Sequence, residues 1–151
     1  MSTDLPHLFE EVCRFLEDEA GGYYACQTPQ QLLWTRHQIA EALAGGRYLI
    51  RRDESDRIVL ALCWQMVLPE DITRLKLREP VPHRPEGTVL FVTNLACANR
   101  VHPLYDGMPG VTRFLCTVPG KGVCFWRHDT RFYYYPGRTG GKEATHGGRH
   151  P

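Results

Sequence analysis

The sequence of 151 residues has no apolar run of the length that a membrane helix needs, and it has no strong net charge. A spanning helix takes about 20 consecutive apolar residues, which no segment here approaches. The acidic start, MSTDLPHLFEEVCRFLEDEAGG, lacks the basic segment and apolar core of a secretory signal. The formal net charge of +1 gives no overall attraction to nucleic acid. We therefore expect a cytoplasmic protein with no membrane partner, and the total charge does not favour a nucleic-acid partner.

Paired cysteine motifs are also missing, although the chain has six cysteines. No two of them form a C-x-x-C pair, so a typical half-site for structural zinc is absent. Without a secretory signal, a disulfide framework is not expected either. Four of the six lie in apolar-patterned segments, where a free cysteine acts as a small hydrophobic residue: Cys13, Cys63, Cys97 and Cys116. We expect core cysteines and no metal.

The composition is that of an ordinary globular domain, and two segments near its start have the pattern of amphipathic helices. The chain is 42% hydrophobic and 23% charged. Apolar residues recur at helical spacing through residues 5–19. In TPQQLLWTRHQIAEALAGG, Thr28 is the predicted N-cap, Gln31 completes a capping box, and Gly45-Gly46 end the helix. The stripe predicted to be buried in this second helix is Leu32, Leu33, Ile39, Ala40 and Leu43.

A hairpin follows the helices. Residues 47–52 and 57–67 read as two strands joined by the polar turn 53–56. The second strand is apolar on both faces, and such a strand is covered on both sides. We therefore predict that 57–67 is an internal strand of a sheet that also contains 47–52 and 88–97.

The rest of the chain alternates between loops and short elements. Residues 69–87 hold four prolines and are predicted to form a loop with at most a short helix at 70–76. The segment TVLFVTNLACA is apolar on both faces and gives the strand 88–97. A short helix is plausible at 109–116, where Val111, Phe114 and Leu115 would pack.

The C-terminal part is predicted to contain one further hairpin and a tail. The segments GVCFWRHD and RFYYYP form the two strands, turned by Asp129-Thr130. From residue 137 to 151 the composition is mainly Gly, Arg, Thr and His, so we expect a disordered tail. The element order is α-α-β-β-β-α-β-β. It predicts a single α+β domain over residues 1–136, with a central, mostly antiparallel sheet and helices on both faces.

This order resembles that of the GNAT-type acyltransferase superfamily. Within it, YLIRRDESDRIVLALCWQMVLPE and the later GTVLFVTNLACANR are similar to segments of the RTX toxin-activating lysine acyltransferases. The matching positions over residues 46–100 are Tyr48, Trp64, Gly87 and Ala96. In that family a His near the first helix and an Asp on the later strand are catalytic. Here Asn94 stands at the Asp position, and EDEAGGYYACQ, where the His would fall, contains none.

The resemblance implies a site around the strand that carries Asn94. Asn94 and Tyr105 would be its catalytic residues, with Tyr105 protonating the departing thiolate. The backbone of that strand and the Gly-rich loop after it would hold the donor's pantetheine arm and phosphates. The residues concerned are Leu95, Ala96, Arg100, Gly107 and Gly110. A polar amide on an apolar strand must be hydrogen-bonded, so Asn94 could equally be a strand-end residue bonded to a neighbour.

Two functions are open on these grounds. The first is a bacterial or phage acyltransferase that takes an acyl group from acyl-CoA or an acyl carrier and transfers it to an amine. The second is a non-catalytic GNAT-like binding protein. It would grip a protein or nucleic-acid partner through the aromatic and basic C-terminal hairpin at 122–135. The acyl donor and the amine acceptor are the expected partners in the first case.

Overall fold

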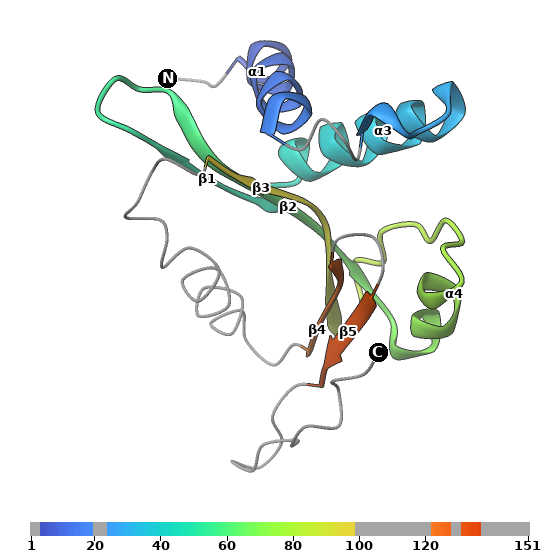
Figure 1. Cartoon of the computed structure of the whole chain (residues 1–151). Coiled ribbons are helices and arrows are strands. Elements are labelled where there is room, and N and C mark those ends of the chain that lie inside the picture. The colour runs from blue at the N-terminus through green and yellow to red at the C-terminus, as the bar shows by residue number, and fades with distance from the viewer. Residues whose placement is uncertain (1–3, 20–23, 99–121, 128–130, 137–151) are drawn as a thin grey trace, which may run out of the picture. The chain divides into compact units, whose positions relative to one another are not determined.

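The computed structural model describes residues 4–19, 24–98, 122–127 and 131–136 (Figure 1). Its strands form one five-stranded sheet in the order β1-β2-β3-β4-β5. The chain divides into two compact units, and both β2 and β3 contribute residues to each. Of the described residues, the first unit contains 4–64 and 93–98, with a gap at 20–23, and the second contains the others. The predicted α+β class with a mostly antiparallel sheet is confirmed.

The two N-terminal helices have the predicted bounds. The helices are α1 (Leu5–Glu19) and α3 (Pro29–Ala44). At the start of α3, the Thr28 hydroxyl accepts a hydrogen bond from the Gln31 amide (3.1 Å), and the Gln31 side chain accepts one from the Thr28 amide (2.9 Å). This reciprocal pair satisfies two amides that the helix itself leaves without a partner. Gly46, at φ +74°, ends the helix in the left-handed conformation that only glycine adopts freely.

The stripe predicted to be buried in α3 was partly wrong. Leu33 is 70% exposed and Ala40 is also exposed, while the buried residues of α3 are Thr35, Ile39, Ala42 and Leu43. These four recur at intervals of three and four and lie on one helix face, whereas Leu33 lies on the opposite side. The α3 face packs with α1 and the strands of the first unit in one core (Figure 1).

The first hairpin is confirmed. Strands β1 (Tyr48–Arg52) and β2 (Ile58–Val67) pair antiparallel, with Tyr48 opposite Cys63. In the turn, one Asp53 carboxylate oxygen accepts from the amides of Ser55 (2.8 Å) and Arg57 (3.0 Å). Strand β2 lies between β1 and β3 and is buried along most of its length, as its apolar pattern predicted.

The second unit contains the loop after β2 and the C-terminal hairpin. A single 3-10 turn, η1 (Pro69–Asp71), leads into the short helix α4 (Ile72–Lys76), as predicted. The remaining strands are β3 (Val89–Cys97), β4 (Gly122–Arg127) and β5 (Arg131–Tyr135). Strands β4 and β5 form the predicted antiparallel hairpin. The predicted helix at 109–116, the turn residues 129–130 and the tail 137–151 lie outside the described residues.

A buried carboxylate anchors the loop of the second unit. Asp71 is 3% exposed and receives two hydrogen bonds from the Arg84 guanidinium, both at 3.0 Å. It also accepts one from the Leu68 amide at 2.9 Å. These donors, Arg84 first among them, lower the pKa of Asp71 below its usual range. The carboxylate thereby ties the start of η1 to the end of the proline-rich loop.

We expect this carboxylate to make the protein sensitive to acid. A group whose pKa is lower in the folded state adds stability above its unfolded pKa, about 3.9 for Asp, and loses it as the pH falls through the folded pKa. Asp71→Asn should therefore lower the free energy of unfolding at pH 7 and have little effect near pH 2. Urea unfolding at the two pH values measures this difference. An equal loss at both would show that the charge of Asp71 is not what stabilises the loop.

Candidate functional site

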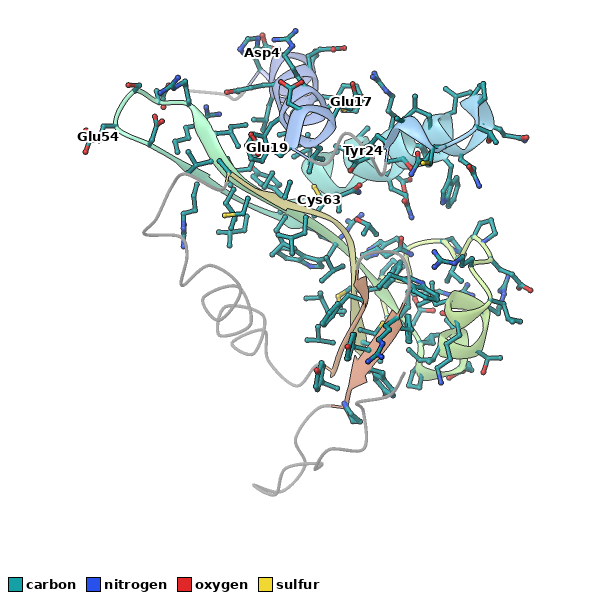
Figure 2. All side chains as sticks on the ribbon, in the orientation of Figure 1. Asp4, Glu17, Glu19, Tyr24, Glu54 and Cys63 are labelled. Carbon is teal, nitrogen blue, oxygen red and sulfur yellow. The ribbon has the colours of Figure 1, made fainter. Side chains whose placement is uncertain are left out.

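A hydrogen bond between two nearly buried side chains joins distant parts of the first unit. The Tyr24 hydroxyl donates to Asn94 Oδ1 at 2.7 Å, across 70 positions of sequence. Tyr24 is 8% exposed and Asn94 is 5% exposed. Tyr24 belongs to the same core cluster as Cys63 of β2 and Ala96 of β3, and Figure 2 shows it near the two helices. The predicted need of Asn94 for a partner is confirmed, and Tyr24 is that partner.

The Asn94 amide is held in a defined orientation by the next residue. Asn94 Nδ2 donates to Thr93 Oγ1 at 3.2 Å, and Thr93 Oγ1 donates to the Cys63 carbonyl at 3.2 Å. Because the one hydroxyl hydrogen of Thr93 goes to Cys63, its oxygen is left to accept from Asn94. The amide oxygen of Asn94 is therefore the atom that faces Tyr24. Among the described residues, the second Nδ2 hydrogen of Asn94 has no acceptor.

The pair contains neither a carboxylate nor an imidazole. The asparagine amide does not ionise, and the hydroxyl hydrogen of Tyr24 is donated to Asn94. The arrangement can donate hydrogen bonds and orient a bound molecule, but it cannot take up a proton as a His–Asp pair does. Its chemistry is that of positioning and of stabilising negative charge.

Four of the five described cysteines have a raised pKa. Burial raises the pKa of the Cys63 thiol to about 12 and that of Cys13 to about 11. Burial also raises the pKa of Cys97 and of Cys124, and the charge of Glu19 adds to the shift at Cys97. A thiol needs a lowered pKa to act as a nucleophile. These four thiols are protonated at neutral pH. The prediction of core cysteines is confirmed for Cys13 and Cys63, whereas Cys97 is only partly buried. Cys116 lies outside the described residues.

Strand β3 continues beyond its pairing with β4. The parallel register between the two strands covers Val89–Phe91, opposite Gly122–Cys124. Strand β3 then runs on to Cys97, and both Leu95 and Ala96 lie in this last part. Ala96 is 8% exposed and belongs to the core of the first unit. The other predicted site residues, Tyr105, Arg100, Gly107 and Gly110, lie outside the described residues.

Sequence reasoning missed Tyr24. The segment EDEAGGYYACQ, where the resemblance implies a catalytic histidine, contains none. The usable signal was the amide of Asn94 on an apolar strand, which predicts a buried partner without naming it. A tyrosine buried by its ring and polar at its tip is a natural partner for such an amide.

No cluster of metal ligands and no helix of membrane-spanning character occurs within the described ranges. No group of three or more His, Cys, Asp or Glu side chains there could hold a metal ion. None of the helices in this part of the chain has both the length and the apolar character needed to cross a membrane.

Comparison with known proteins identifies the fold. No protein-family model matches the sequence, and no curated protein matches it. Among solved structures, the chain is similar to the GphF GNAT-like decarboxylase in complex with isobutyryl-CoA, with a TM-score of 0.51 and 18% sequence identity. The match covers 80% of this chain and 61% of that one, so the chain spans about three fifths of its neighbour's length. At this identity the likeness shows the fold alone, and that fold is GNAT-like.

Proposed function

We propose that this protein binds an acyl thioester of coenzyme A or of an acyl carrier and transfers the acyl group to an amine. The observation that carries the proposal is the buried hydrogen bond between Tyr24 and Asn94, a residue of β3. The GNAT-like fold supports it, because the solved neighbour with this fold holds isobutyryl-CoA. The similarity to toxin-activating acyltransferases over residues 46–100 supports the amine as acceptor.

The end of β3 has the groups to hold the donor's pantetheine arm. Among the described residues, the pairing of β3 with β4 ends at Phe91. Backbone amides and carbonyls of an extended strand can pair with the amides of a linear ligand, as they do with an added strand. Leu95 and Ala96 would supply these groups. The phosphates would fall near residues 100–110, where Arg100, Gly107 and Gly110 are the proposed contacts.

The pair would act on the thioester by orientation and charge stabilisation. As the amine nitrogen forms its bond to the carbonyl carbon, negative charge develops on the carbonyl oxygen. The remaining Nδ2 hydrogen of Asn94 is a donor for that oxygen. The carbon–sulfur bond then breaks, and the thiolate takes a proton, for which Tyr105 remains the proposed source. The proton that the amine nitrogen loses passes through water to the Tyr105 phenolate, which restores the hydroxyl. The Tyr24 hydroxyl bonds to the Asn94 oxygen and so fixes the direction in which the Asn94 Nδ2 hydrogen points.

The Tyr24–Asn94 pair contains no carboxylate or imidazole, which leads to a prediction about pH. Because neither side chain of this pair is a general base, we expect the amine to react in its uncharged form. The rate should rise with pH up to the pKa of the acceptor amine. Asn94→Asp removes the Nδ2 donor and should therefore lower the rate. It should also flatten the rise of the rate with pH, since a carboxylate at this position can take the proton. An Asn94→Asp variant with the same pH profile as the parent would contradict the assigned role.

A titration of thermal stability tests the binding claim. A ligand that binds only the folded state raises the melting temperature, by an amount that grows with its concentration. Acetyl-CoA, longer acyl-CoAs and free CoA should be compared. We expect a shift with at least one acyl-CoA. If no CoA species shifts the melting temperature, the non-catalytic function becomes the better account.

Decarboxylation is a second candidate, favoured because the Tyr24–Asn94 pair contains no carboxylate or imidazole. Loss of CO₂ from a malonyl-type thioester leaves the bonding electrons in an enolate, which needs hydrogen-bond donors and a later proton at carbon. The solved neighbour with this fold is itself described as a decarboxylase. Mass spectrometry of mixtures with malonyl-CoA, or with acetyl-CoA and an amine, separates the two reactions by their products.

A further inference from the structure

The two faces of the β4–β5 hairpin have different partners. Alternate residues of the strands face the core of the second unit, where Cys124 and Phe132 are buried and Trp126 and Tyr134 pack beside them. The Trp126 indole donates to the Leu75 carbonyl at 3.3 Å. Folding therefore accounts for the aromatic residues on this side of the hairpin.

The opposite face of the hairpin carries a second set of aromatic rings, Phe125, Tyr133 and Tyr135, here called the aromatic face. Phe125 and Tyr133 are register partners with ring centroids 5.4 Å apart and planes at 24°. The ring planes of Tyr133 and Tyr135 are nearly parallel, at 3°, and their centroids are 6.4 Å apart. The ring centroids of Phe125 and Tyr135 are 6.1 Å apart. None of the three belongs to the core cluster, and Tyr135 is 43% exposed. The face is thus a row of stacked rings at the edge strand of the sheet.

Positive charge gathers in the same part of the chain. Arg131 is exposed at the turn end of β5, on the same strand face as Tyr133 and Tyr135. Residues 121–151 contain six Lys or Arg and two Asp or Glu, a net of +4. Residues 1–120 contain twelve Lys or Arg and fifteen Asp or Glu, a net charge of −3. The near-neutral total therefore hides a basic C-terminal part, which favours an anionic partner.

We propose that the aromatic face is a binding surface for single-stranded nucleic acid. Unpaired bases stack on exposed aromatic rings whatever their sequence, while Lys and Arg beside the rings contact the phosphates. An acidic peptide would satisfy the charge but not the rings, because carboxylates do not stack. The proposal stands independently of the acyl-thioester site. It departs from the expectation, drawn from total charge, that nucleic acid is not a partner.

Fluorescence anisotropy with labelled (dT)15 and (rU)15 oligonucleotides tests the proposal on the full chain. The Tyr133→Leu/Tyr135→Leu variant keeps apolar bulk on the strand but removes two stacking rings, and should bind about tenfold to a thousandfold more weakly. If the double variant folds poorly, Tyr135→Leu alone replaces it, because Tyr135 lies at the exposed end of the row. The single variant should lose less affinity than the double variant. Trp34→Leu is the matched control, because Trp34 is an exposed aromatic of α3 (38%) and its loss should not change binding.

The electrostatic part is tested by salt. Arg131→Gln should reduce the slope of log K against log salt by about 0.7, the value for one phosphate contact on a single strand. Arg51→Gln, an equal charge change in the other hairpin, should leave the slope unchanged. The proposal is overturned if neither oligonucleotide binds at 50 mM salt, or if the tyrosine variants bind as the parent does. It is equally overturned if polyglutamate competes as well as an unlabelled oligonucleotide, since that result indicates an acidic protein partner.

Discussion

Replacing Asn94 with leucine should lower the turnover number by about a hundredfold or more while leaving the protein folded. Leucine has the same branched heavy-atom skeleton as asparagine, although its methyl groups are larger, and it neither donates nor accepts a hydrogen bond. Loss of one donor to a developing oxyanion costs about 10²–10³ in turnover where this has been measured in enzymes. Release of free thiol from acyl-CoA in the presence of an amine gives the rate, and urea unfolding gives the stability.

A double-mutant cycle separates catalysis from folding at this pair. Asn94→Leu removes the acceptor of the Tyr24 hydroxyl, and Tyr24→Phe removes the donor. Each single variant should lose stability, and the double variant should lose less than the sum, by about 1 kcal/mol. Turnover should stay low in every variant that lacks Asn94.

A buried amide elsewhere provides the control for Asn94→Leu. Gln65 is 5% exposed, and its Nε2 donates to the Val81 carbonyl at 2.7 Å. Gln65→Leu should reduce the free energy of unfolding without changing turnover. If Gln65→Leu lowers turnover as strongly as Asn94→Leu, the effect at Asn94 is structural and its catalytic role is wrong.

Replacing Gly87 with alanine should strongly destabilise the second unit. A Cβ at Gly87 would lie 2.5 Å from the Val67 carbonyl oxygen and 2.7 Å from the Val67 nitrogen. These atoms belong to the backbone of β2, so they cannot turn away as a side chain could. We expect a loss of about 3 kcal/mol, which lowers the melting temperature by about 10 °C.

Gly45→Ala is the matched control for this loss. Its Cβ would meet the guanidinium end of Arg47, which can move, and would lie 3.3 Å from the Glu41 carbonyl oxygen, a much milder approach than at Gly87. The expected loss is below about 1 kcal/mol. Calorimetry of both variants should therefore give clearly different melting temperatures. Equal, small changes would mean that the approach of residue 87 to β2 is not as close as described.

The sequence predicted the elements well where local chemistry decides them. The capping box at Thr28 and Gln31 fixed the start of α3, and the apolar pattern on both faces of 57–67 placed β2 inside the sheet. It failed at Leu33, whose apolar character suggested burial. Helix α3 has hydrophobic residues on more than one side, so its pattern alone could not tell which side meets the core.

The candidate site was predictable only in part. The apolar surroundings of Asn94 indicated that its amide needs a partner. Neither spacing nor composition indicated Tyr24, because the two lie 70 positions apart and are brought together only by the packing of the helices on the strands. The aromatic face was recognised as a pattern, but only the strand register separates Phe125, Tyr133 and Tyr135 from the rings that face the core.

The central claim is that an acyl thioester binds beside the Tyr24–Asn94 pair, and NMR of ¹³C-tyrosine-labelled protein tests it most directly. The Tyr24 signal is identified as the one missing from the Tyr24→Phe variant. We predict that this signal shifts and saturates with an acyl-CoA, and that free CoA, which lacks the thioester, shifts it less. If an acyl-CoA saturates the protein and the Tyr24 signal does not move, or if no acyl-CoA binds, the site assigned to this pair is wrong.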